Sequence, residues 1–317
     1  MAYSREEAAL NETPDGPRKP RLLDEVRRRI RAKRYSLRTE EAYLYWIRRY
    51  IQANGRRHPR DLDGGVVEHF LSELARRYRV AASTQNQALA ALLFLYREVL
   101  AMELPWLENV IRAKGVRRLP VVLSLAETAA LLRSLAGREA LMAGLLYGSG
   151  LRLMECLRLR VKDVDLARNE ITVREGKGGK DRRTVLPSSL REPLRLQLEQ
   201  VRILHEHDLG AGFGAVSLPA ALARKYRRAE RELGWQFVFP ATRRAIDPLD
   251  GREKRHHLDE SVLQRAVRAA ARSAGIDKPV SPHTLRHCFA THVLGSGSDI
   301  RTVQALLGHK DVGRTSV

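Results

Sequence analysis

Apolar residues recur three or four positions apart through the first third of the chain. This spacing places them on one face of an α-helix. It predicts four helices, over residues 22–30, 39–53, 66–78 and 83–102. Ser83 is expected to be the N-cap of the fourth. Since no alternating strand pattern interrupts these segments, the sequence predicts an all-helical domain over residues 21–104.

Two proline-containing stretches frame this domain. Residues 1–20 hold three prolines and mixed charges with little apolar periodicity, which predicts a flexible leader. Residues 105–120 are polar and basic and begin and end with proline, which predicts a linker. A second domain over 121–317 follows, and its first helix begins at Ser124, which has the capping-box spacing to Glu127.

The second domain mixes strands with helices. The segments 171–173 and 184–186 flank the glycine-rich GKGGKDR, which predicts a β-hairpin. Helices are predicted over about 188–208, after the caps Asp259 and Asp299, and from His283 to Gly295. The stretch 209–257 is irregular except for its Trp-Gln-Phe-Val-Phe run, in which Phe237 and Phe239 are expected to be buried. The fold class is therefore mainly α with a small β-hairpin: a helical domain followed by a mixed α+β domain.

The chain carries a formal net charge of +20 over 317 residues. Such an excess is usually compensated by a polyanion such as nucleic acid. The longest apolar run, 88–96, is far shorter than the roughly 20 residues of a membrane-spanning helix, and the N-terminus lacks a secretory signal. Cys156 and Cys288 are expected to be buried thiols, as in a reducing cytoplasm.

Cationic side chains occupy four places in the second domain. They are Arg152 after a Gly-Ser-Gly turn, Lys177 at the hairpin tip, His283 and Arg286 on one helix face, and His309 just beyond a helix-ending glycine. Each alone is most often a solvated charge or a structural histidine. GKGGK lacks the spacing of an ATP-binding loop, and the histidines lack the spacing of a zinc site. We therefore expect no cofactor.

In this order the five residues resemble the catalytic set of the tyrosine recombinases, the phage-integrase type, in which they surround one scissile DNA phosphate. The helical domain is similar to that family's core-binding domain, so the resemblance covers about residues 22–317. It implies strand exchange through a 3′-phosphotyrosyl intermediate without a metal. Guanidinium forks suit this task because they donate paired hydrogen bonds to phosphate oxygens and stay charged. Lys177 or a histidine would protonate the leaving 5′ oxygen.

The nucleophile departs from the family pattern. The family's tyrosine lies about nine residues past the final histidine, one position after Val317, and the last tyrosine present is Tyr226. We therefore expect the chain as written to bind DNA without cleaving it. A truncated gene, a fragment and a frameshift after Val312 all fit, and a tetrameric synapse is expected only with the missing tail.

The insertion at about 209–257, and the strings SLRTEEAYLYWIRRYI, RLPVVLS and DIRTVQALLGH, resemble integron integrases. These enzymes read extrahelical bases on the folded single strand of a cassette attachment site, besides a duplex integron site. Base reading needs surfaces for stacking and a basic groove. The matching positions are Trp235, Pro248, His256 and His257, with Arg224, Lys225, Arg227 and Arg228 supplying charge. Trp235 fits a core position equally well.

The expected function is the integration and excision of gene cassettes. An inactive DNA-binding remnant, and a Xer-type or phage recombinase acting on duplex DNA, remain alternatives. All depend on Arg152 and Arg286 converging, with neither buried against a carboxylate.

Overall fold

The chain divides into two compact units, Met1–Arg117 and Arg118–Val317, and the division falls inside the predicted linker. The computed structural model describes residues 21–104, 110–113, 119–174, 181–226 and 228–308. The predicted leader and most of the predicted linker lie outside the described residues. Within the described part, no helix has the length and apolar character that crossing a membrane requires.

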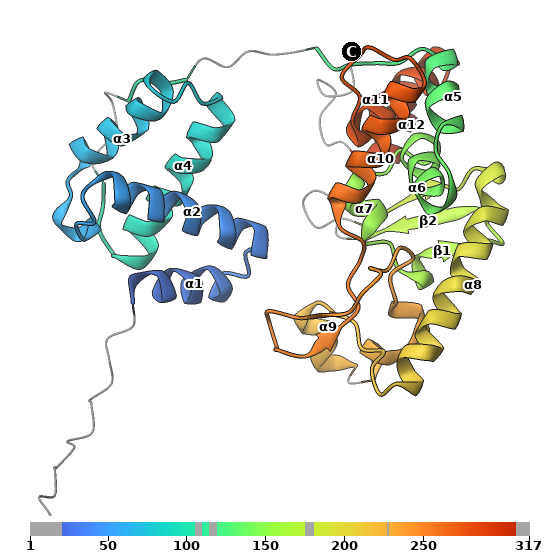
Figure 1. Cartoon of the computed structure of the whole chain (residues 1–317), viewed down its shortest axis with the longest axis horizontal. Coiled ribbons are helices and arrows are strands. Elements are labelled where there is room, and N and C mark those ends of the chain that lie inside the picture. Colours follow the sequence, from blue (N-terminus) through green and yellow to red (C-terminus); the bar gives the residue numbers. More distant parts are fainter. Residues whose placement is uncertain (1–20, 105–109, 114–118, 175–180, 227, 309–317) are drawn as a thin grey trace, which may run out of the picture. The chain divides into compact units, whose positions relative to one another are not determined.

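The first unit is helical, as predicted (Figure 1). Its elements are α1 (Leu22–Ala32), α2 (Leu37–Ala53), the short 3-10 turn η1 (Pro59–Asp61), α3 (Gly64–Arg76), α4 (Ala82–Phe94) and the π-turn η2 (Leu95–Val99). Their apolar faces meet in one core. At its centre, the buried hydroxyls of Tyr50 and Tyr96 are 3.0 Å apart, and Tyr96 also donates to the Pro59 carbonyl at 3.0 Å.

The predicted cap of the fourth helix is wrong. The N-cap is Ala81, not Ser83, because the Ala81 carbonyl already accepts the first helical hydrogen bonds, from the main-chain N–H groups of Thr84 and Gln85. The helix also changes to a π-turn at Leu95.

The second unit combines helices with two small antiparallel sheets. Its elements are α5 (Leu125–Arg133), α6 (Gly137–Gly148), α7 (Leu153–Leu157), η3 (Val161–Asp163), β1 (Val164–Asp165), β2 (Glu170–Val173), β3 (Arg182–Val185), α8 (Ser188–Gly210), α9 (Ala220–Lys225), η4 (Ala229–Arg231), η5 (Leu233–Trp235), β4 (Ala245–Ile246), β5 (Glu253–Lys254), α10 (Glu260–Ser273), α11 (Pro282–Gly295) and α12 (Ile300–Leu307).

The predicted hairpin is confirmed as the β2–β3 pair, whose last matched residues are Val173 and Arg182. Its tip, 175–180, lies outside the described residues. The two-residue β1 extends the sheet to the order β1-β2-β3 and was not predicted. The capping box of Ser124 with Glu127 is confirmed.

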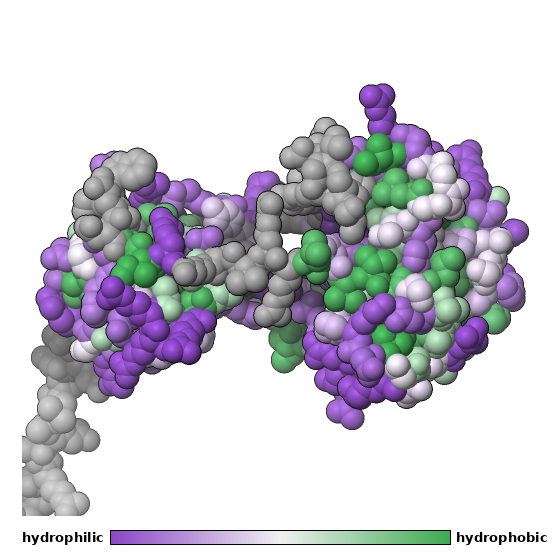
Figure 2. Space-filling view, turned by 90° about the horizontal axis from the view of Figure 1, so that it is seen from above, coloured by the Kyte–Doolittle hydropathy of each residue, from purple (hydrophilic) through white to green (hydrophobic). Residues whose placement is uncertain are grey.

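Helix α6 lies at the centre of the second unit and packs against α5, α8, α10 and α11 (Figure 1). Cys156 and Cys288 are buried in this core as free thiols, as expected. Figure 2 shows hydrophilic residues over much of the visible surface of both units, interrupted by hydrophobic patches.

Candidate functional site

The turn that precedes Arg152 depends on a glycine. Gly150 has a φ of +62°, and a Cβ atom there would lie 2.6 Å from the ring of Phe289. Only glycine tolerates both the left-handed backbone and this close approach. The turn places Arg152 at the N-cap of α7 and leaves the Gly150 carbonyl accepting a hydrogen bond from Nη1 of Arg286.

Arg286 lies near the start of α11, and only 8% of its side chain is exposed. Its Nη2 donates to the Leu307 carbonyl at 2.6 Å, which ties α11 to the last turn of α12. Burial, followed by the nearby positive charge of Arg152, lowers the pKa of Arg286 to about 9. The guanidinium is therefore still charged at neutral pH, and it lies close to that of Arg152.

One carboxylate, that of Glu155 on α7, joins the arginines. Arg152 Nη1 lies 2.5 Å from Oε1, and Arg286 Nη1 lies 3.8 Å from Oε2. Arg182 on β3 binds both oxygens, at 3.0 and 2.6 Å. We call Arg152, Glu155, Arg182 and Arg286 the Glu155 cluster.

The charge of this cluster is unbalanced. Burial raises the pKa of Glu155, but the hydrogen bonds from Arg182 and Arg152 outweigh it and bring the pKa to about 2. Three guanidiniums therefore share one ionised carboxylate. With a quarter of the Arg152 side chain exposed, the surplus positive charge is accessible to a small anion such as a phosphate.

The expectation that Arg152 and Arg286 avoid carboxylates was wrong, although the two do come together. The condition was too strict, because three guanidiniums beside one carboxylate still leave surplus positive charge. The reason is electrostatic. Guanidiniums that converge in a mostly buried place repel one another, and a shared carboxylate offsets part of that repulsion.

The histidines lie partly outside the described chain. His283 is exposed on α11, three residues before Arg286 and thus on the same helix face. Lys177 and His309 lie outside the described residues. The residue before His309, Gly308, ends α12 with a φ of +65°, and a Cβ atom there would lie 2.9 Å from Cδ of Arg182.

Sequence reasoning missed Glu155 and Arg182. Glu155 stands three residues after Arg152, so the helical spacing alone pairs them. On β3 side chains alternate, so Arg182 faces the same way as the buried Thr184, whereas Arg183 is exposed. That alternation was the available signal for an inward arginine.

Within the insertion, the buried positions are as expected. Phe237 and Phe239 are buried, and the Val238 N–H donates to the Leu159 carbonyl at 2.8 Å. Trp235 is half-buried, and Nζ of Lys162 lies over its ring, 2.8 Å from the centroid. The Trp235 carbonyl accepts from Arg160 at 2.6 Å.

The other proposed base-contacting positions differ in exposure. Pro248 is exposed between β4 and β5, beside Ile246 and Leu249, which are 71% and 62% exposed. His256 is half-buried, with Nε2 3.9 Å from Asp247.

His257 packs edge-on against Phe237, and burial lowers its pKa. Lys225 and Arg228 are exposed, whereas the side chains of Arg224 and Arg227 lie outside the described part.

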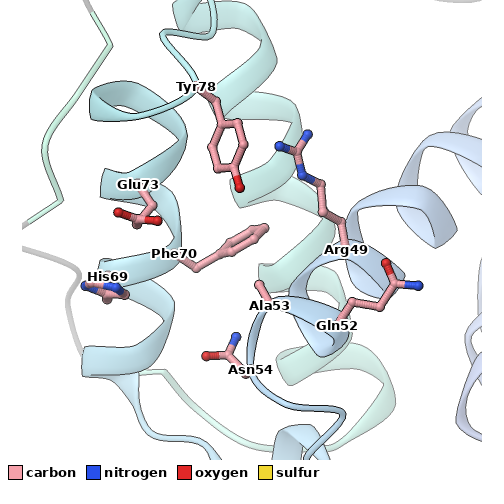
Figure 3. A pocket seen from close by; sticks show the side chains of 8 residues that line it. All are labelled: Arg49, Gln52, Ala53, Asn54, His69, Phe70, Glu73 and Tyr78. Carbon is pink, nitrogen blue, oxygen red and sulfur yellow. The ribbon is translucent and has the colours of Figure 1, made fainter.

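The first unit contains a pocket of its own. Figure 3 shows Phe70 pointing from α3 towards α2, with Tyr78 and Arg49 beside it. The Arg49 guanidinium lies 4.6 Å from the centroid of the Tyr78 ring. The lining residues are Arg49, Gln52, Ala53, Asn54, His69, Phe70, Glu73 and Tyr78. No predicted site residue is among them.

Two family models match the chain. The model of the phage integrase family matches residues 119–317, and that of the phage integrase N-terminal SAM-like domain matches 22–106.

Similar proteins include an integrase/recombinase of Escherichia coli, 50% identical over 95% of this chain and 89% of its own length. The tyrosine recombinase XerA of Thermococcus kodakarensis is 31% identical over 88% of this chain and 83% of its own. Among solved structures, the Tn1549 transposon integrase in complex with transposon right end DNA is similar, with a TM-score of 0.59, 16% identity and 93% of each chain covered. The last of these supports the fold alone.

Proposed function

This chain belongs to the phage integrase family of tyrosine recombinases, and we propose that it rearranges DNA by holding one scissile phosphate at the Glu155 cluster. The observation that carries this is the convergence of Arg152 and Arg286, with surplus positive charge, on one carboxylate. Negative charge grows on the non-bridging phosphate oxygens during attack, and fixed guanidinium donors stabilise it there.

The remaining roles follow the family resemblance. A tyrosine hydroxyl would attack the phosphorus atom and form a phosphotyrosyl bond, giving up its own proton to a histidine or to solvent. The bond from phosphorus to the 5′ oxygen would break, and that oxygen would leave with a proton from Lys177 or a histidine. The reverse step, attack by a 5′ hydroxyl, would release the tyrosine. His283, on the same helix face as Arg286, would donate a hydrogen bond to the phosphate.

We further propose that the DNA carries unpaired bases, as in a folded integron cassette site. The insertion supports this, because it is folded and carries the exposed Pro248 and the half-buried Trp235 and His256. Exposed Lys225 and Arg228 supply charge for the backbone. With a tyrosine-bearing tail, we expect four copies to assemble on two DNA sites.

The test of strand cleavage uses the chain extended after Val317 by a tyrosine and a short tail. Its substrate is a nicked suicide duplex or hairpin that traps the covalent adduct. We expect an adduct that is lost when Arg286 is replaced by Met while the protein stays folded. A folded, DNA-binding extended chain without an adduct would instead favour a DNA-binding protein that does not cleave.

The choice of DNA is tested with the 317-residue chain in mobility-shift assays. We expect a bulged hairpin to bind more tightly than the same sequence as a perfect duplex, with affinity that falls steeply with salt. Preference for the perfect duplex would favour a Xer-type or phage recombinase.

A further inference from the structure

Arg182 joins three separate elements of the second unit. From β3, its Nη1 and Nη2 hold both oxygens of Glu155 on α7, at 3.0 and 2.6 Å. Its Nε donates to the Leu306 carbonyl in the last turn of α12, at 2.9 Å. Since 10% of the side chain is exposed, these bonds are largely shielded from water.

The contact of Arg182 with α12 is one of two hydrogen bonds that arginines donate to the end of this helix. The last carbonyls of a helix have no partner within it and need donors from elsewhere. Arg182 supplies one to Leu306, and Arg286 supplies one to Leu307. The same two guanidiniums also contact Glu155, so the end of α12 and the arginine cluster are held in one arrangement.

The contact with Glu155 governs how strongly that carboxylate attracts the other arginines. Arg182 occupies both of its oxygens, whereas Arg286 reaches only to 3.8 Å. Without Arg182, the carboxylate would be balanced by Arg152 and Arg286 alone. Arg286, now 3.8 Å from Glu155, would then be drawn towards the carboxylate, and Arg152, already 2.5 Å away, would be held there more strongly, so that both would be less available to an incoming phosphate.

We propose that Arg182 is a positioning residue for phosphate binding: by sharing the charge of Glu155 and holding the end of α12, it weakens the hold of that carboxylate on Arg152 and Arg286 and so makes them more available to the scissile phosphate. Arg182 itself need not touch DNA. The inference rests on the proposed function, because it assigns the phosphate to the Glu155 cluster.

The test measures whether Arg182 is coupled to a single phosphate. The tyrosine-extended chain first locates the cleaved position on its DNA. A methylphosphonate at that position then removes one negative charge from the non-bridging oxygens. The 317-residue chain is titrated with charged and methylphosphonate DNA, and the ratio of the two Kd values reports phosphate recognition.

Arg182→Met and Arg182→Lys are compared with Arg183→Met and Arg183→Lys. Arg183 is the matched control, because it is the next residue on the same strand, its side chain is 67% exposed, and it pairs with Glu170 only at 3.6 Å. Lysine keeps the charge but cannot hold two carboxylate oxygens and a carbonyl together. Arg182→Lys therefore carries the test if Arg182→Met unfolds.

We expect the methylphosphonate to weaken the wild type and both Arg183 variants about tenfold, the usual scale for a charge-assisted contact. The penalty should fall to about twofold in the Arg182 variants, measured at a temperature below the unfolding transition of each variant. A full penalty in Arg182→Lys overturns the positioning role and leaves the proposed function intact. An extended chain that forms no adduct overturns the proposed function and this inference with it.

Discussion

Arg255 and Asp208 form a two-armed salt bridge across 47 positions of sequence, with Nε–Oδ2 at 2.6 Å and Nη2–Oδ1 at 2.8 Å. Asp208 stands near the end of α8, and Arg255 directly follows β5. The bridge therefore closes the insertion at its base, and Arg244 adds a third bond to Asp208 at 2.7 Å.

Asp208→Ala should destabilise the second unit. It leaves Arg255, whose side chain is 10% exposed, without its main counter-charge. Removing one partner of a buried ion pair costs about 3–5 kcal/mol. We expect a loss of that size in urea unfolding. Glu192→Ala, which removes an exposed helical pair with Arg195, is the control and should cost less than about 0.5 kcal/mol. Equal losses in the two variants would show that the Asp208–Arg255 bridge stabilises the protein no more than an exposed ion pair does.

Glu155 should make stability depend on acid pH. Its folded pKa of about 2 lies below the ordinary value, so its contribution is complete above about pH 4.5 and is lost as the pH falls towards 2. The shift corresponds to about 3 kcal/mol. Urea unfolding of the wild type and of Glu155→Gln from pH 6 to pH 3 measures the contribution of the ionised Glu155 to the free energy of unfolding. The difference between them should shrink as the pH falls, and a constant difference would contradict the assignment.

Gly150→Ala should cost more than a backbone penalty. At +62° any L-residue is strained by about 1 kcal/mol, and the new methyl group would lie 2.6 Å from Phe289. Gly275→Ala is the matched control, because its φ is +67° and nothing lies within 4 Å of its Cβ position. We expect a loss of about 1 kcal/mol for Gly275→Ala and about 2–4 kcal/mol for Gly150→Ala in thermal unfolding. Equal losses would mean that Phe289 moves aside freely.

Trp235→Ala should reduce the preference for bulged DNA. Stacking of a base on an aromatic ring contributes about 1–3 kcal/mol, which corresponds to roughly 5-fold to 150-fold in affinity. Mobility shifts should show weaker binding of the bulged hairpin and unchanged binding of the perfect duplex. Trp235→Phe keeps a ring and should retain most of the preference. An equal loss on both DNAs would assign Trp235 to the core.

Local patterns predicted the helices and the hairpin because the signal for each of them lies within a short stretch of sequence. The apolar stripes of α1 to α3 and the glycine-rich hairpin signal are of this kind. The fourth helix was harder, because a main-chain carbonyl of Ala81 begins it without any capping side chain.

The site was predictable only in part. Arg152 and Arg286 were found, but the pairing of Arg182 with Glu155 spans 27 residues, and no local rule connects them. Their roles depend on β3 lying beside α7, which is a property of the tertiary structure. Trp235 was ambiguous for the same reason, since its exposure depends on whether Lys162 reaches its ring.

The main chain at Gly150 limits how such an arginine site can be altered or transferred to another protein. Its carbonyl orients Arg286, yet it has no side chain that a survey of charged groups would detect. A mutational scan confined to polar residues would pass over it, and a designer grafting the arginines onto another scaffold would need to copy this loop's shape first. The part to be transferred is therefore the turn at Gly150 together with the arginines that it positions.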